Sequence, residues 1–266
     1  MFSNKLKTLN KILNLRRTKA FRLIDDSQIE KVINYFKPTL TNHKLIRIGE
    51  KNDGGYLIPD ILKEIKYCFS AGVGHTNEFE TDLNKYKIKS FLADYSIDKS
   101  IRNLHEFDFL KKFIASFDDE ISKNINSWIF EKISQKELNK TILKLDVEGS
   151  EYEILSSLDE RILQELKIII IEFHGLEMIG DENTNKILIS ILRKISKYFY
   201  VAHIHPNNCC GTHYISKFKV PSALEVTYIN KKNAERKDGF CTIPNELDSK
   251  NVQKKSDIIL SDYWIK

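Results

Sequence analysis

Two carboxylates, Asp146 and Glu148, directly follow an apolar run in the stretch ILKLDVEGSEYEIL. The apolar run predicts a buried strand, and the amphipathic residues after it predict a helix. A charge buried in an apolar core is costly unless it is paired or used to bind something. We therefore expect both acids to line a polar cleft at the end of this strand.

Further groups suited to proton transfer or ligand binding follow the next two apolar runs. KIIIIEFHG supplies Glu172 and His174, and FYVAHIHPN supplies His203, His205 and Asn207. Carboxylates and imidazoles act as general bases and as metal ligands. A lone histidine is more often a core residue than a catalyst. Here three histidines each lie near the end of an apolar run, and this placement indicates that they converge on one site.

A glycine turn and a well-spaced acid occur earlier in the chain. Gly72 and Gly74 follow the run KYCFSAG, and Asp94 stands about 20 residues beyond Gly74, at the end of another apolar run. At this spacing an acid accepts hydrogen bonds from a ribose in nucleotide-binding folds. A plain tight turn and a helix N-cap are the alternatives. Taken together, the two features predict a nucleoside-containing ligand.

Two weaker candidates come from loops. The stretch GEKNDGGYLIPD is a turn signal, in which Lys51, Asp53 and Gly55 could also hold a carboxylate or amine of a ligand. Ser116 follows the third apolar run and could contact an adenine amine, although a polar loop is the favoured interpretation.

The elements that would position these groups form an alternating pattern. Seven apolar runs, most of them separated by helical stretches, predict an α/β fold with a doubly wound sheet. The last two runs have no helix between them, which predicts a closing antiparallel hairpin at one edge. Ligands bind outside the carboxyl ends of strands in such a sheet. The runs are KYCFSAG, KIKSFLADYS, KKFIASF, TILKLDVEGS, KIIIIEFHG, FYVAHIHPN and ALEVTYI.

Length and composition predict one large domain with an appendage. We expect an N-terminal helical extension over residues 1–48 and the main domain over residues 49–266 of the 266-residue chain. An amphipathic basic helix within residues 2–17 would pack on the domain or on a partner subunit, which makes a homodimer plausible; contact with a membrane surface is the alternative. The net charge of +5 is compatible with an anionic ligand but too small for a nucleic-acid binder.

The four cysteines contain no CxxC pair, which predicts reduced thiols and no zinc site. No apolar run reaches the length of a transmembrane segment, and the N-terminus lacks a signal-peptide pattern. We therefore expect a cytoplasmic protein.

Taken together, these stretches resemble the FkbM-type methyltransferases. LKLDVEGSEYEIL and IEFHG are similar to two consecutive motifs of that family. DGGYLIP, SAGVGHTNEFE and HIHPNN with EVTYI resemble a subgroup found in bacterial surface-polysaccharide gene clusters. The resemblance covers residues 49–229. It implies a class I, Rossmann-like methyltransferase fold with strand order 3-2-1-4-5-7-6 and an antiparallel seventh strand.

The resemblance also implies an activity, which is S-adenosylmethionine-dependent O-methylation of a sugar or polyketide hydroxyl. We expect a sugar or nucleotide-activated sugar, such as a heptose or deoxysugar for capsule. Gly72, Gly74 and Asp94 would hold the cofactor, assisted by Lys51, Asp53, Gly55, Ser116 and Asp146. The substrate side would comprise Glu148, His203, His205 and Asn207, with His174, Asp146 and Glu172 as the catalytic group.

Two schemes for handling the acceptor proton stay open. His174 or a neighbouring carboxylate accepts the proton, or Asp146, Glu172 and His174 bind a divalent metal such as Mg²⁺ or Mn²⁺. Two other functions also remain: an inactive S-adenosylmethionine-binding module, and a nicotinamide-dependent oxidoreductase on a similar sheet. The missing third glycine of the dinucleotide motif weighs against the oxidoreductase. Nucleic-acid methylation is disfavoured because no basic stripe with aromatic residues is present.

Overall fold

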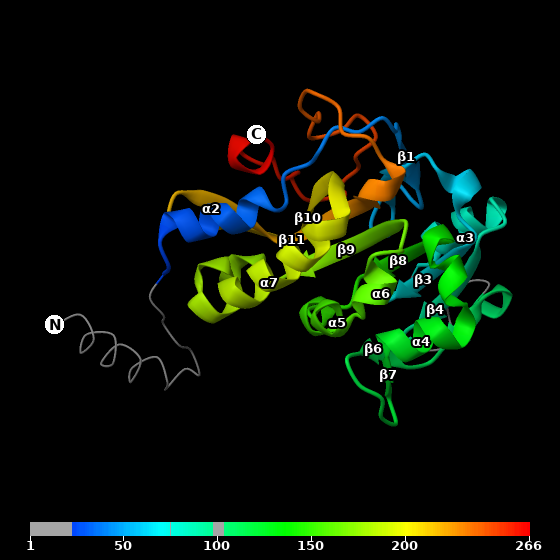
Figure 1. Ribbon diagram of the computed structural model, residues 1–266. Helices are drawn as coiled ribbons and strands as arrows, with labels where there is room; N and C mark the ends of the chain where they lie inside the picture. The colour runs from blue at the N-terminus through cyan, green and yellow to red at the C-terminus, as the bar shows by residue number, and fades with distance from the viewer. Residues whose placement is uncertain (1–22, 75, 98–103) are drawn as a thin grey trace.

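A seven-stranded sheet forms the centre of the protein (Figure 1). The structure, a computed structural model, describes residues 23–74, 76–97 and 104–266. The amphipathic helix predicted within residues 2–17 lies outside the described residues. The sheet strands are β3 (Tyr67–Ala71), β4 (Lys89–Ala93), β5 (Asp108–Leu110), β8 (Thr141–Leu145), β9 (Ile168–His174), β10 (Phe199–Ile215) and β11 (Phe218–Asn230).

The strands lie in the order β5-β4-β3-β8-β9-β11-β10. From β5 to β9, neighbouring strands are parallel, and β11 runs antiparallel to both β9 and β10. Counted along the chain, this order reads 3-2-1-4-5-7-6, the order that the resemblance implies. The predicted α/β fold with a mostly parallel sheet is confirmed, as is the antiparallel hairpin at one edge.

Helices cover one face of the sheet. The longest, α7 (Glu182–Tyr198), buries Leu188, Ile191, Leu192 and Ile195, at the spacing that places side chains on one helical face. These residues join the main apolar cluster beneath the sheet. The other helices of this layer are α2 (Asp26–Asn34), α4 (Ile125–Lys132), α5 (Glu151–Ser157) and α6 (Glu160–Leu163).

The opposite face of the sheet is covered by a small hairpin and one helix. The hairpin pairs β1 (Leu45–Ile48) with β2 (Tyr56–Pro59), and the helix is α3 (Glu78–Lys85). Strand β9 contributes Ile168 and Ile170 to this side and Ile169 and Ile171 to the helical side, which explains its unbroken apolar run.

The predicted boundary between residues 48 and 49 falls between the two paired strands of the hairpin. Residues of α2 also belong to the same apolar cluster as the central sheet. The division of the chain into an extension and a main domain stays a prediction.

The third strand differs from its prediction. We expected KKFIASF to be that strand, but the sheet is extended by β5, which precedes it. The chain turns after Leu110, where Lys112 N donates to the Leu110 carbonyl at 2.9 Å. Within KKFIASF, β6 (Phe113–Ala115) instead pairs with β7 (Ser122–Asn124) in a separate two-stranded sheet. Short apolar runs on either side of a turn cannot be ranked by periodicity alone.

The prediction of reduced thiols is wrong for one pair of cysteines. Cys209 and Cys210, adjacent in β10, form a disulfide, whereas Cys68 and Cys241 are free. Within the described residues, the helices are too short or too polar to span a bilayer.

Candidate active site

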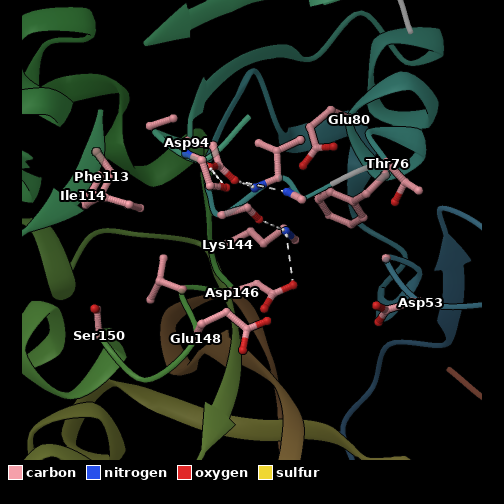
Figure 2. A pocket seen from close by; sticks show the side chains of 18 residues that line it. Asp53, Thr76, Glu80, Asp94, Phe113, Ile114, Lys144, Asp146, Glu148 and Ser150 are labelled. Carbon is pink, nitrogen blue, oxygen red and sulfur yellow. Dashed lines mark hydrogen bonds and ion pairs between the residues drawn. The ribbon is translucent and has the colours of Figure 1, made fainter. Parts of the chain in front are cut away.

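A cavity of about 560 Å³ opens at the carboxyl ends of β3, β4 and β8 (Figure 2). This is where a doubly wound sheet is expected to bind its ligand, and the volume lies within the range of small-molecule sites. The lining residues are Asp53, Gly54, Gly72, Val73, Gly74, Thr76, Phe79, Glu80, Ala93, Asp94, Ser96, Phe113, Ile114, Lys144, Asp146, Val147, Glu148 and Ser150.

Asp94, at the end of β4, holds the glycine loop that follows β3. Its Oδ2 accepts hydrogen bonds from the backbone N–H groups of Val73 at 3.0 Å and Gly74 at 3.2 Å. Its Oδ1 accepts from the backbone and the hydroxyl of Ser96 at 2.8 and 2.7 Å. These four donors fill the lone-pair directions of a carboxylate. The sequence spacing between Gly74 and Asp94 is therefore explained by direct hydrogen bonds between the glycine loop and the Asp94 carboxylate.

The two glycines of the loop serve different purposes. A Cβ on Gly72 would stand 1.6 Å from the backbone oxygen of Asp146, so only glycine allows β3 and β8 to approach this closely. A Cβ on Gly74 would have no atom within 4 Å, because it would face the open cavity. Both residues have positive φ angles, of 73° and 64°. Gly72 is therefore needed for packing, and Gly74 leaves room for a ligand.

A buried lysine forms part of the cavity lining. Lys144 Nζ donates to the Gly72 carbonyl at 2.8 Å and lies 3.9 Å from Asp146 Oδ2. Burial lowers the pKa of the Lys144 ammonium, but Asp146 and Glu80 outweigh burial and raise this pKa above its ordinary value. Lys144 therefore carries a fixed positive charge beside the Asp146 carboxylate.

Asp146 is also bound from the opposite layer. The hydroxyl of Tyr56, in β2, donates to Asp146 Oδ2 at 3.1 Å. Burial, followed by the charge of Asp146, raises the pKa of Tyr56 well above its ordinary value, so the phenol stays protonated as a donor. The Asp146 carboxylate is thus fixed at the cavity edge, as the opening stretch of the sequence suggested.

The turn between β8 and α5 brings Glu148 to His174. Glu148 has a φ of 50°, which is uncommon for a residue other than glycine. Its Oε2 lies 3.5 Å from His174 Nε2. Beneath the turn, the fully buried Glu151 accepts hydrogen bonds from the backbone N–H groups of Gly149 at 2.8 Å and His174 at 2.6 Å. Glu151 thereby holds the ends of β8 and β9 together.

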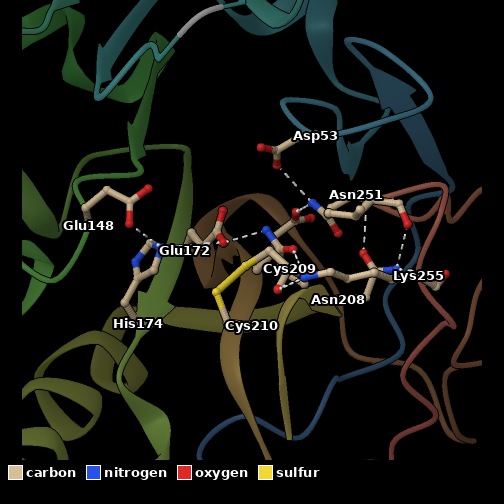
Figure 3. Close-up of a disulfide and its surroundings, with 12 residues drawn as sticks. Asp53, Glu148, Glu172, His174, Asn208, Cys209, Cys210, Asn251 and Lys255 are labelled. Carbon is tan, nitrogen blue, oxygen red and sulfur yellow. Dashed lines mark hydrogen bonds and ion pairs between the residues drawn. A yellow bond between two sulfur atoms is a disulfide. The ribbon is translucent and has the colours of Figure 1, made fainter. Parts of the chain in front are cut away.

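His174 lies among carboxylates at the end of β9 (Figure 3). Its Nδ1 is 3.5 Å from Glu151 Oε1, and its Nε2 is 3.6 Å from Glu172 Oε1. Burial lowers the pKa of His174, but Glu151, with Asp146 and Glu148, outweighs burial and raises this pKa above 6.5. An imidazole in this position can accept a proton and be stabilised once it is charged.

A second group of acids lies behind His174. Glu172 in β9 stands directly opposite Glu225 in β11, and both side chains are buried. Glu172 Oε1 accepts a hydrogen bond from Asn207 Nδ2 at 2.8 Å, and Glu225 Oε1 accepts from Asn251 Nδ2 at 2.6 Å. Asp53 reaches this group from the loop before β2, where Asn251 Nδ2 donates to its Oδ1 at 3.1 Å.

Two of the predicted histidines bind the C-terminal segment. His203 Nε2 lies 2.8 Å from Asp248 Oδ1, and His205 Nδ1 lies 3.7 Å from the same oxygen. Burial raises the pKa of Asp248, but the two histidines outweigh burial and bring this pKa well below its ordinary value. In this structure His203 serves to dock a segment, and it does not line the cavity.

The predicted site residues fall into three sets. Gly72, Gly74, Asp94, Asp53, Asp146 and Glu148 line the cavity. Glu172, His174, His205 and Asn207 lie beside it, on β9 and β10. Lys51, Gly55, Ser116 and His203 are not among the residues that line the cavity. Ser116 N, for example, donates to Glu153 Oε1 at 3.2 Å, and the Lys51 carbonyl accepts from Gln253 at 3.0 Å.

The predicted metal ligands do not form one set. Asp146 and His174 group with Glu148, with ligand atoms within 4.8 Å of one another, while Glu172 groups with Asp53 and Glu225. Several residues in and beside the cavity were missed by the sequence analysis: Tyr56, Lys144, Glu151, Glu225, Asp248 and Asn251. Only Glu151 had a sequence signal, as a second acid three residues after Glu148.

The cavity fits the cofactor that the resemblance implies. Gly74 leaves open space above the loop, and Asp94 fixes the two backbone N–H groups beside it. Phe79 and Ile114 add apolar walls suited to an adenine ring. A sulfonium carries positive charge, which Asp146 and Glu148 can balance at the other end of the cavity.

Comparison with known families agrees with this geometry. Residues 38–199 match the methyltransferase FkbM domain. A search among curated proteins gave no match. The matched segment contains the glycine loop, Asp94, the turn after β8 and His174, and it covers more than half of the chain. The chain therefore belongs to the FkbM methyltransferase family.

Proposed function

We propose that this protein transfers a methyl group from S-adenosylmethionine to a hydroxyl of a sugar. The observation that supports this proposal is the arrangement of residues around one cavity. A glycine loop held by Asp94 forms one end, and Asp146, Glu148 and the adjacent His174 form the other. A cofactor site and a base thus meet at the carboxyl edge of the sheet.

The cofactor end is formed by the glycine loop and Asp94. Bound S-adenosylmethionine would supply an electrophilic methyl group on a sulfonium. Gly74 gives the backbone room to approach the cofactor, and Lys144 holds the loop through the Gly72 carbonyl. A ribose hydroxyl would take the place of the Ser96 hydroxyl on Asp94, because all four acceptor directions of that carboxylate are in use.

His174 is the proposed general base. A neutral sugar hydroxyl is a weak nucleophile and needs a group that accepts its proton as the new bond forms. His174 Nε2 faces Glu148 and Glu172, so the charge that it gains would be balanced by carboxylates. The buried Glu151 fixes the position of His174 through the backbone. In this scheme His174 holds the proton. The residues around it orient the acceptor and exclude bulk water.

A nucleotide-activated sugar for a surface polysaccharide is the proposed acceptor. The exposed Glu148 and the cavity-lining Asp53 offer acceptors for sugar hydroxyls. The net charge of +5 suits a substrate that carries a diphosphate.

Methyl transfer from radiolabelled S-adenosylmethionine to a panel of nucleotide-activated sugars tests this function. The proposal expects label in a sugar acceptor and little transfer by His174→Gln. A matched control is His213→Gln, which changes an exposed histidine on β10. Full turnover by His174→Gln would remove His174 as the base. Binding of NADH in place of S-adenosylmethionine would contradict the whole reaction class.

A further inference from the structure

A line of charged side chains crosses the sheet beside the cavity. Glu172, Glu225 and His205 occupy directly opposed positions on β9, β11 and β10. Carboxylates that face each other across a strand pair are destabilising unless something compensates their charge. Here both carboxylates are buried, with exposed fractions of 3% for Glu172 and 6% for Glu225, so water cannot screen them.

A third carboxylate completes the group. Oxygen atoms of Asp53, Glu172 and Glu225 all lie within 4.8 Å of one another. Two oxygens bound to the same Mg²⁺, Mn²⁺ or Ca²⁺ ion lie at most about 4–5 Å apart, since each metal–oxygen bond is roughly 2.0–2.6 Å. A sugar ring could not fit between the three carboxylates. The space suits a single ion.

The three carboxylates face two imidazoles. His174 Nε2 lies 3.6 Å from Glu172 Oε1, and His205 stands directly opposite Glu225. Among the described residues, no lysine or arginine comes within ion-pair distance of these three carboxylates. The nearby Arg47 guanidinium binds backbone carbonyls, at 2.7 Å for Glu50 and 3.2 Å for Asn52.

Two buried polar side chains beside these acids have atoms that make no hydrogen bond among the described residues. Asn251 has an exposed fraction of 7%, and its Nδ2 points at Asp53 and Glu225, while its Oδ1 has no hydrogen-bond donor among the described residues. His205 is 6% exposed, and its ring nitrogens make no hydrogen bond, although Nδ1 lies 3.7 Å from Asp248 Oδ1. A buried acceptor without a donor is costly. Rotating the Asn251 amide by half a turn would present Oδ1 as a fourth oxygen ligand.

We propose that Asp53, Glu172, Glu225 and Asn251 bind a divalent metal ion, of the hard type represented by Mg²⁺ and Mn²⁺. All four ligand atoms are oxygens, which these ions prefer. The ion would join three separate parts of the chain: the loop before β2, the central sheet and the C-terminal segment. It differs from the sequence-based metal prediction because its ligands include neither Asp146 nor His174.

The position of the ion suggests its use. Asp53 also lines the cavity, so an ion bound there would stand at the acceptor end. It could bind a sugar hydroxyl and lower the pKa of that hydroxyl. This use rests on the proposed function, whereas the binding of the ion does not.

Titration of the chelator-treated full chain with Mn²⁺, followed by the electron paramagnetic resonance of free Mn²⁺, tests the site. Saturable binding of one ion per chain is expected, weakened at least about tenfold by Glu225→Gln and by Asp53→Asn. Glu225→Gln keeps the shape of a buried side chain, and Asp53→Asn changes an exposed one, so a folding defect cannot explain both losses. Glu148→Gln is the matched control, because it removes a carboxylate from the neighbouring group, and it should leave Mn²⁺ affinity unchanged.

Two results would overturn the proposal. One is the absence of saturable Mn²⁺ binding, and the other is binding that only Glu148→Gln weakens, which would assign the ion to Asp146, Glu148 and His174. S-adenosylmethionine affinity is measured in the same samples. If S-adenosylmethionine does not bind, the proposed methyl transfer is refuted. The Mn²⁺ result is then judged separately, because it does not depend on the cofactor.

Discussion

The substitutions Gly72→Ala and Gly74→Ala form a matched pair that tests the described geometry of the glycine loop. Both place a methyl group on a residue with a left-handed backbone, at φ angles of 73° and 64°. They differ in what the new methyl group meets. At Gly72 it would stand 1.6 Å from the Asp146 carbonyl oxygen, and at Gly74 it would enter open space.

The expected loss of stability follows from this difference. A left-handed backbone costs an alanine about 1–2 kcal/mol relative to glycine, and both variants should lose that amount. Gly72→Ala must also separate the ends of β3 and β8, because the clash is with backbone atoms that cannot rotate away. Overpacking of this kind adds about 1–3 kcal/mol. The free energy of unfolding should therefore fall clearly further in Gly72→Ala.

Urea denaturation, followed by circular dichroism, measures both free energies under identical conditions. Binding of S-adenosylmethionine to the folded variants gives a second readout. Gly72→Ala should also weaken cofactor binding, because Gly72 positions the loop against Asp146. Equal losses of stability in the two variants, or a larger loss in Gly74→Ala, would refute the close approach of the two strand ends.

Three further substitutions test other parts of the site. Asp94→Asn removes an acceptor of two backbone N–H groups, and its S-adenosylmethionine affinity, measured by calorimetry, should fall roughly tenfold or more; unchanged affinity would contradict the role of Asp94. His174→Gln should lower kcat about 10²–10⁴-fold while leaving S-adenosylmethionine affinity intact, and near-normal turnover would exclude it as the base. Asp248→Asn should lower the free energy of unfolding by about 1–3 kcal/mol in urea denaturation, because it weakens the buried pair with His203. No loss would show that the C-terminal segment is not docked there.

The sequence was sufficient to predict the positions of those site residues that lie at the ends of strands. Apolar runs mark buried strands, and the residue that follows each run must reach the same edge of a parallel sheet. Gly72, Asp94, Asp146 and His174 could be located in this way. The absence of a helix between the last two runs was also sufficient to predict the edge hairpin.

Other residues could not be located because their positions depend on contacts distant in sequence. Glu225 lies within the apolar strand ALEVTYI, where alternation alone gives it no special meaning. Asn251 and Asp248 come from a C-terminal segment without periodicity, and only the fold brings them to β10 and β11. Ser116 was expected at the end of a central strand, but KKFIASF supplies β6, which lies outside the central sheet.

The buried Lys144 illustrates a different limit. Its position inside the run TILKL suggests a strand residue on a solvated edge, yet its exposed fraction is 4%. The ammonium is accommodated because it meets the Gly72 carbonyl and the Asp146 carboxylate, which come from two different strand ends. No local pattern of residues predicts such a pairing.

Calorimetric titration of the full chain with S-adenosylmethionine, and separately with NADH, tests the central claim most directly. The account predicts saturable binding of S-adenosylmethionine, weakened by Asp94→Asn, and no binding of NADH. A well-folded protein that failed to bind S-adenosylmethionine, or that bound NADH instead, would contradict the assignment of the cavity as a methyl-donor site.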